Sequence, residues 1–407
     1  MKKIFSLLVL CATVVFASCS KDDPVTDPVP EGIVVTTYEA LLDALQTGGT
    51  SADAPTLITL GGNITVPAGG DYDTPPINGS GHFKIDGGGH TITWESTANN
   101  HHLLGNTSPD ADAVYIELTN INLDRQDMNA AVGVYNGKIT LGKDVALSGQ
   151  DGNMILANGE KAALELGDGC ELSYAAGSSP CCASAWFGAI LVLNGGKTAA
   201  GAYIGLDCNF YPAVSYPLIS VPKALTGDVH LLLKMIGTTP VAQGIGNYQL
   251  TQADCDRLKV NPESTVSLYM GQRDKYDGNF ELHLDPAASF QIKLRPKNFT
   301  PPTSGNIDVT NMTDVVAQIT IRAALEAGHT DLKLTGELSK IGIGGQWGTF
   351  ANNTQITTCD LTEVTGWGTT PTLPELAFKD CTKLQEVTLP DGVQVIGEYA
   401  FKIGRAS

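Results

Sequence analysis

Two arginines, Arg125 and Arg295, are the best candidates in this chain for residues that could take part in cleaving a polysaccharide. Arg125 has Asp124 and Asp127 beside it, and Arg295 lies at the end of an expected strand. Cleavage of a glycosidic bond needs carboxylates that bind Ca²⁺ or transfer protons, and a lyase also needs a basic group beside the sugar. Because no further catalytic motif accompanies them, we predict that both arginines are solvated turn residues and that no residue is catalytic.

Residue types that bind metal ions occur at unsuitable spacings. His101 and His102 are adjacent and would point apart on a strand. Asp110 and Asp112 alternate in a loop without the other ligands of a calcium site. The nine cysteines include no Cys-x-x-Cys pair, which argues against a zinc site. We expect no metal and no cofactor, and we expect the cysteines to be mostly structural.

Aromatic residues in turns could stack on sugars or on protein side chains. Tyr211 and Tyr216 belong to an aromatic cluster, whereas Trp347 and Trp367 lie in or beside a long irregular segment. These four residues are the candidate binding residues. Buried stacking between neighbouring coils is the alternative role for them.

The N-terminal segment indicates export. A positively charged start at residues 1–3 precedes an apolar run, residues 4–15, that is well short of the ~20 residues needed to cross a bilayer. Cys19 then follows Ala17 and Ser18, and this pattern resembles a bacterial lipoprotein signal. The resemblance implies removal of residues 1–18 and acylation of Cys19, so that lipid on Cys19 makes a membrane the first partner.

Residues 19–32 form an acidic tether in which proline recurs, so we expect it to stay extended. Its start, Ser20 to Asp23, resembles the export signal of surface lipoproteins of the Bacteroides group. The resemblance implies a lipid-anchored outer-membrane protein exposed on the cell surface. The formal net charge of −18 disfavours nucleic acid as a partner.

From about residue 56 to 298, short β-type runs alternate with Gly, Asn and Asp turns. The stretches 137–147 and 160–172 align, and they place Leu141 and Leu166 25 residues apart. This period predicts a solenoid in which each coil buries its inward residues against the next. The pattern resembles the right-handed parallel β-helix of pectate-lyase-like proteins, so we expect a mainly β fold with this domain at 33–298. An antiparallel β-sandwich is the alternative.

Two helices are expected to cap solenoids. Thr36 is the predicted N-cap of the first, which ends at Gly48 and would cover the open strand edges of the first coil. Residues 299–312 are typical of a linker. Thr313 is the predicted N-cap of a second helix, which ends at Gly328 and would cap a second solenoid.

The most specific repeat lies between residues 335 and 401. Phe378 and Phe401, each preceded by alanine, are 23 residues apart. The segment strongly resembles a BspA-type leucine-rich repeat, which places a short or truncated repeat domain at 313–407. The resemblance implies that Cys381 packs inside and that the core includes Leu384, Val387, Leu389, Val393, Ile396 and Phe401.

The predicted location on the cell surface and the two predicted solenoids favour a binding function, because solenoids present long, rigid surfaces. BspA-type proteins are associated with attachment to host or matrix proteins and to other bacteria. By this resemblance, the chain is expected to be an adhesin-like surface lipoprotein that binds a host or matrix protein or a surface glycan. A polysaccharide lyase or glycoside hydrolase that uses the β-helix groove is the alternative, and a scaffold without a high-affinity ligand is a third.

Overall fold

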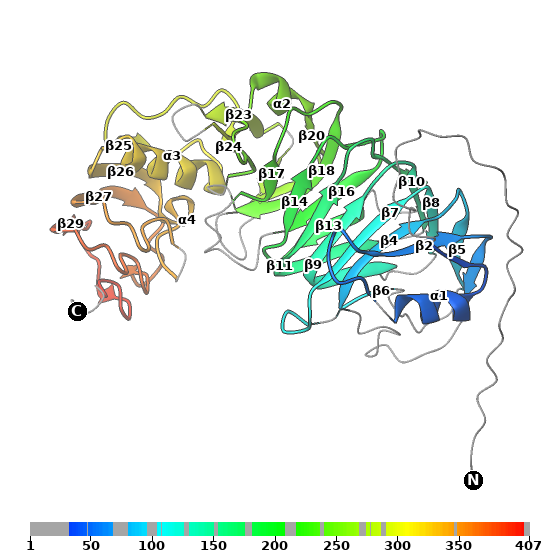
Figure 1. Ribbon diagram of the computed structural model, residues 1–407. Coiled ribbons are helices and arrows are strands. Elements are labelled where there is room, and N and C mark those ends of the chain that lie inside the picture. Colours follow the sequence, from blue (N-terminus) through cyan, green and yellow to red (C-terminus); the bar gives the residue numbers. More distant parts are fainter. Residues whose placement is uncertain are drawn as a thin grey trace, which may run out of the picture. The chain divides into compact units, whose positions relative to one another are not determined.

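The fold is a parallel β-solenoid of about 11 turns that spans residues 33–396 and contains few helices (Figure 1). The computed structural model describes residues 32–46, 48–67, 80–95, 104–106, 108–125, 130–149, 154–175, 181–207, 217–236, 240–267, 274–276, 278–285, 290–345 and 348–402. The predicted mainly β class and the solenoid are therefore confirmed.

Three ladders of strands build the coils up to residue 267. The first ladder, all parallel, contains β1 (Ile33–Val35), β2 (Thr56–Leu60), β4 (Gly81–Asp86), β7 (Val114–Thr119), β9 (Val132–Leu141), β11 (Ile155–Leu166), β14 (Ile190–Leu193), β17 (Ile219–Val221) and β19 (Ala242–Gly244). The second contains β6 (Leu104–Gly105), β9, β11, β13 (Cys181–Trp186), β16 (Tyr203–Asp207), β18 (Val229–Ile236), β20 (Leu258–Val260) and β21 (Thr265–Ser267). The third contains β3 (Ile64–Val66), β5 (Thr91–Trp94), β8 (Ile121–Arg125), β10 (Val145–Gly149), β12 (Glu171–Ala175) and β15 (Lys197–Thr198).

The core of the solenoid is a set of aligned columns of inward side chains. One column runs through the first ladder, with each residue in register with the next, and every member is at most 2% exposed: Phe83, Ile116, Ile139, Leu164, Leu191 and Ile219. Burying a side chain of this size stabilises the fold by about 1.5–3 kcal/mol. Since side chains alternate across a strand, the residues between them face outward in equally regular columns.

The strands β9 and β11 bend, because each contributes to two ladders. In β9, Val132 and Gly133 pair with β6, whereas residues 137–141 pair with β7. Gly137 lies at the bend with φ +127°, and a Cβ on it would clash with the carbonyl oxygen of Val114. Only glycine fits this position.

The helix α1 (Tyr38–Leu45) covers the first coil. Leu41 and Leu45 are buried in the same core as β1 and β3. The predicted N-cap was wrong by one residue: Thr37, not Thr36, has extended backbone angles and accepts a hydrogen bond from Ala40 N at 3.2 Å.

The parallel pattern ends in antiparallel strands. After the short helix α2 (Gln252–Arg257), β22 (Asp274–Lys275) runs antiparallel to β21. The strands β23 (Phe280–Asp285) and β24 (Gln291–Pro296) form an antiparallel hairpin, and β24 pairs antiparallel with β19. The parallel pairing of the first ladder therefore ends at β19, and β24 and β23 extend the same sheet in antiparallel fashion.

Shorter coils follow. A parallel ladder joins β25 (Asn306–Asp308), β26 (Asp331–Glu337), β27 (Thr358–Thr365) and β29 (Glu386–Thr388), and a second joins β28 (Thr372–Leu373) and β30 (Val395–Ile396). Thr313 caps α3 (Asp314–Glu326) as predicted, and a short helix, α4 (Leu338–Ile341), follows β26. The β25 strand lies inside the range predicted as a linker, and the domain boundaries stay predictions.

The last described coil is only partly covered. Phe350, Phe378 and Phe401 stack in a column with centroid separations of 5.1 and 5.6 Å. Cys381 is buried as predicted, but Phe401 is 42% and Ile396 51% exposed, so the prediction that these two are core residues is wrong. Leu384, Val387, Leu389 and Val393 are half-buried. An inward side chain becomes fully buried only when a following coil packs on it. Among the described residues, no coil stacks on the one that contains Ile396 and Phe401.

Replacing Gly137 by alanine tests the bend in β9. The positive φ and the clash with the Val114 carbonyl should destabilise the fold by about 2–4 kcal/mol. Gly62→Ala is the matched control, because nothing lies within 4 Å of an added Cβ there. Urea unfolding followed by circular dichroism measures both. Equal unfolding midpoints for the two variants would contradict the conclusion that the bend in β9 requires glycine at position 137.

Candidate functional site

A groove on the outer face of the first ladder combines an aromatic pair with charged side chains. We call it the Tyr115 groove. It has a volume of about 300 Å³, within the range of small ligand pockets. Its lining comes from β4, β7, β9 and the segment before β2: Ala52, Pro55, His82, Phe83, Lys84, Tyr115, Ile116, Glu117, Lys138 and Thr140.

Strand register explains why these side chains meet. His82, Tyr115 and Lys138 occupy equivalent positions on three adjacent strands, and Lys84, Glu117 and Thr140 form a second outward column two residues further along. Adjacent strands lie about 4.8 Å apart, so neighbours in a column are in contact distance. The inward residues between the columns anchor each strand in the core.

An aromatic pair forms part of the floor. The rings of His82 and Tyr115 are stacked, with centroids 4.4 Å apart and planes within 5° of parallel. Tyr115 is 38% exposed, whereas most large apolar side chains of this ladder are buried. The stack holds the tyrosine in one orientation before any ligand arrives.

Opposite charges pair along the columns. Lys84 Nζ lies 3.2 Å from Glu117 Oε2, and Lys138 Nζ lies 2.6 Å from Glu165 Oε2. Glu165 also accepts a hydrogen bond from Asn194 Nδ2 at 2.9 Å. Glu117 and Glu165 are two strands apart, roughly 10 Å from the strand spacing. Both lysines of the groove and its Glu117 carboxylate are therefore engaged in ion pairs, and Glu165 lies just outside the lining.

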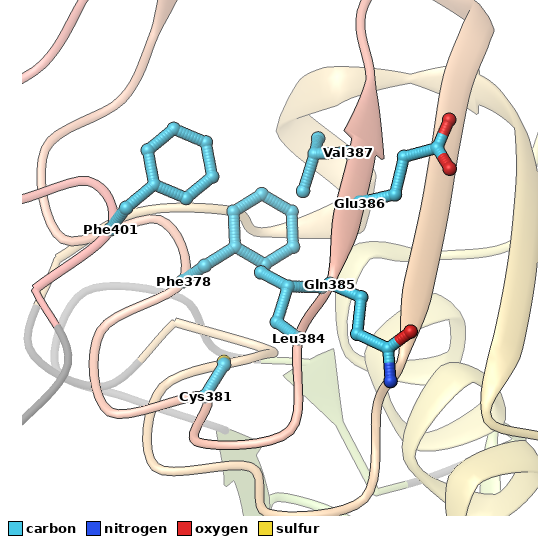
Figure 2. Close-up of a pocket in the computed structure, with 7 residues that line it drawn as sticks. All are labelled: Phe378, Cys381, Leu384, Gln385, Glu386, Val387 and Phe401. Atoms are coloured by element: carbon cyan, nitrogen blue, oxygen red, sulfur yellow. The ribbon is translucent and has the colours of Figure 1, made fainter.

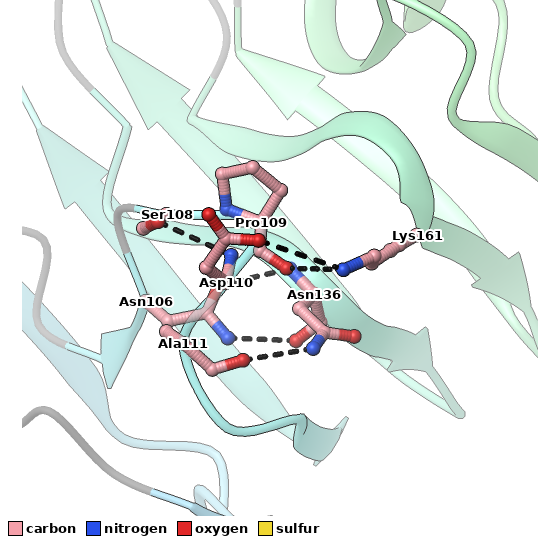
Figure 3. A network of polar contacts seen from close by, with 7 residues as sticks. All are labelled: Asn106, Ser108, Pro109, Asp110, Ala111, Asn136 and Lys161. Carbon is pink, nitrogen blue, oxygen red and sulfur yellow. Dashed lines mark hydrogen bonds and ion pairs between the residues drawn. The ribbon is translucent and has the colours of Figure 1, made fainter.

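A buried amide fixes the chain beside the groove (Figure 3). The Asn106 side chain is 1% exposed and donates to the carbonyl oxygens of Asp112 and Asn136, at 3.0 and 2.7 Å. Its Oδ1 accepts from Tyr135 N and Asn136 N at 2.6 and 3.1 Å. These four bonds tie the turn before Tyr115 to the strand that carries Lys138.

A lysine interacts with the loop considered for calcium. Lys161 Nζ donates to the Pro109 carbonyl oxygen at 2.9 Å and lies 3.8 Å from Asp110 Oδ1 (Figure 3). Within the described part of the chain, no His, Cys, Asp and Glu side chains are grouped closely enough to hold a metal ion.

Arg125 does not lie where the sequence predicted. It continues the inward alternation of Ile121 and Leu123 on β8 and is 0% exposed, so the prediction of a solvated turn residue is wrong. Its guanidinium Cζ lies 5.4 Å from the centroid of the Trp94 ring, and Nη1 donates to the Ala130 carbonyl oxygen. The arginine therefore contributes to packing inside the coil.

Arg295 is half-exposed on β24, where its Nε donates to Glu281 Oε1 at 2.7 Å across the hairpin. Arg295 lines a separate pocket, and neither residue of the pair lines the Tyr115 groove.

Of the four candidate binding aromatics, only Trp367 is described. It is half-buried against the core, and its Nε1 donates to the Val364 carbonyl oxygen at 2.7 Å, which fits the alternative of a packing role. Tyr211, Tyr216 and Trp347, like Cys19, lie outside the described residues. Five residues of the groove were not predicted from the sequence: His82, Lys84, Tyr115, Glu117 and Lys138. Their signal in the sequence is a pair of outward residues at matching positions of successive coils.

A second, smaller hollow of about 110 Å³ lies at the last coil. Figure 2 shows the Phe378 and Phe401 rings beside Leu384 and Val387, with the Glu386 carboxylate directed away from them. The hollow is too small for a typical ligand.

The six described cysteines are buried thiols. Burial raises the pKa of Cys170 to about 12 and that of Cys255 and Cys381 to about 11. Thiols with such pKa values are poor nucleophiles at neutral pH, which agrees with the predicted structural role.

Comparisons with known proteins identify no relative of this chain. A scan against protein-family models and searches of curated proteins and of solved structures found no match. Among the described residues, no helix has the length and apolar composition that a membrane span requires.

Replacing Asn106 by alanine tests the role of the buried amide. The change leaves buried donors and acceptors unsatisfied, so we expect a loss of about 2–3 kcal/mol of stability. Asn63→Ala is the control, because the exposed Asn63 accepts one bond, from Thr91 N, and should lose about 1 kcal/mol or less. Urea unfolding measures both, and equal losses would contradict the assignment.

Proposed function

We propose that this chain is an adhesin-like cell-surface lipoprotein and that the Tyr115 groove is its ligand-binding site. The observation that carries the proposal is the groove itself: a hollow of about 300 Å³ that presents a stacked aromatic pair and charged side chains on a rigid sheet. The ligand is a host or matrix protein or a surface glycan. The acidic net charge of −18 disfavours nucleic acid.

The finer features of the fold are part of the proposal. We infer that the coils are right-handed, as almost all parallel strand crossovers are. We also infer a pectate-lyase-like β-helix at 33–298 with α1 as its cap, and a BspA-type leucine-rich repeat domain at 313–407 with α3 as its cap. The spacing of Phe378 and Phe401 and their stacked rings support the repeat.

Lipid on Cys19 is proposed to hold the protein in the outer membrane, exposed on the cell surface. The support is the apolar run at residues 4–15 followed by Ala17, Ser18 and Cys19.

A polysaccharide lyase or hydrolase is the second candidate. The observation that favours it is the placement of Glu117 and Glu165 on one face together with Lys84 and Lys138. The ion pairs argue against it, because each carboxylate is held by a lysine rather than directed at a substrate.

Replacing Cys19 by alanine tests the anchor. We expect the variant to move from the detergent phase to the aqueous phase in detergent partitioning, and to resist radiolabelling with palmitate. Ser18→Ala, which keeps the small residue before the cysteine, should behave as the wild type. An unlabelled wild-type protein, or a labelled Cys19→Ala variant, would contradict the anchor.

Replacing Tyr115 by alanine tests the binding site. Purified residues 20–407 would be applied to arrays of matrix proteins and glycans. We expect the variant to lose at least about tenfold in affinity for the bound ligand, because central aromatic side chains dominate binding energies. Tyr399→Ala, at a 56% exposed tyrosine of the last coil, is the control and should bind as the wild type.

If the Tyr115→Ala variant bound the ligand as tightly as the wild type, the groove would not be the ligand-binding site. Release of new reducing ends from any glycan in the same experiment would favour the second candidate over a binding protein.

A further inference from the structure

Within the described part of the chain, both lysines that line the Tyr115 groove have a carboxylate partner. Lys84 is ion-paired with Glu117, and Lys138 is ion-paired with Glu165. Glu165 is only 10% exposed and has Asn194 as a further partner. A polyanionic glycan would place its negative groups beside the Glu117 and Glu165 carboxylates and would approach a chain whose net charge is −18. The charges of the groove therefore disfavour uronate and sulfate groups.

The groove also disfavours an extended peptide. Peptides commonly bind by adding a strand to an open sheet edge, where their main chain finds partners. Here β4 pairs with β2 and β7, β7 with β4 and β9, and β9 with β7 and β11. The strands under the groove are therefore interior on both sides, and only side chains are offered to a ligand.

Those side chains match the two surfaces of a sugar ring. His82 covers one face of the Tyr115 ring, and the exposed part of that ring, together with Pro55 of the groove lining, offers apolar contact to the C–H face of a pyranose. The Glu117 side chain is 38% exposed and the Lys84 side chain 49%, and each end group has more hydrogen-bonding positions than their mutual pair uses. One acceptor and one donor held side by side suit the adjacent hydroxyls of a sugar.

We propose that the Tyr115 groove binds a neutral, hydroxyl-rich glycan chain, with Tyr115 as the stacking platform and the Lys84–Glu117 pair as the hydroxyl-binding element. This inference rests on the proposed binding function and narrows its ligand to one chemical class. Because each lysine is paired with a carboxylate, the groove supplies polar contacts without attracting acidic polysaccharides. The ion pairs would therefore make the groove selective for neutral glycans.

The test compares neutral and acidic polysaccharides on purified residues 20–407. Xyloglucan, galactomannan and dextran are the neutral probes, and polygalacturonate, alginate and heparin are the acidic ones. Affinity gel electrophoresis and calorimetry at 150 mM salt measure binding. We expect at least one neutral probe to bind, with an affinity that falls about tenfold or more in Tyr115→Ala, and no acidic probe to bind the wild type.

Glu117→Gln tests this selectivity. The change keeps the shape of the side chain but leaves Lys84 without its carboxylate, so we expect neutral binding to weaken by about threefold to tenfold and acidic probes to gain affinity. Glu281→Gln is the matched control, because it breaks the Arg295 pair outside the groove and should change neither class. Unchanged melting curves establish that the variants are folded.

The outcomes separate this inference from the proposed function. Acidic probes that bind the wild type through Tyr115 would overturn the neutral-glycan inference and keep the groove as a binding site. If a matrix protein bound through Tyr115 and no glycan bound, the neutral-glycan inference would likewise be overturned and the groove would remain a binding site. Ligands that bind all groove variants equally would overturn both proposals, as would the absence of any ligand.

Discussion

Each coil of this solenoid depends on its neighbour to bury its inward apolar side chains. The column from Phe83 to Ile219 is at most 2% exposed because every member packs between equivalent residues of the coils before and after it. The first coil obtains this cover from α1 instead, through Leu41 and Leu45. At the last described coil, Phe401 stacks on Phe378 on one side only. Phe401 is therefore 42% exposed, because no described coil covers its other side.

The same register that aligns the core also aligns the outer surface. A side chain on the outer face of one strand meets its counterpart on the next, so His82 stacks on Tyr115 and Lys84 pairs with Glu117 without any loop to bring them together. The groove is consequently as rigid as the sheet beneath it. Asn106 adds to this rigidity, because its buried amide joins the turn before β7 to the strand β9.

The sequence was sufficient for the features that repeat. Short apolar runs between glycine-rich turns predicted the stacked strands, and Thr313 predicted the start of α3. It was not sufficient where a side chain departs from its usual preference. Arg125 occupies an inward position that the alternation of Ile121 and Leu123 assigns to an apolar residue, and its packing against Trp94 depends on a contact between coils. The groove was missed for a related reason: its residues are far apart in sequence and ordinary in type, and only the pairing of β4, β7 and β9 brings them together.

The antiparallel strand β24 has a consequence for how the chain is made. In a parallel ladder each finished coil is a template for the next, so ordering can advance from the N-terminal end while later residues are still being synthesised. Such growth has no inherent stopping point. The antiparallel strands β24 and β23 interrupt this growth, and both lie upstream of β25. The parallel ladder that ends at β19 can thus be ordered before the shorter coils are made.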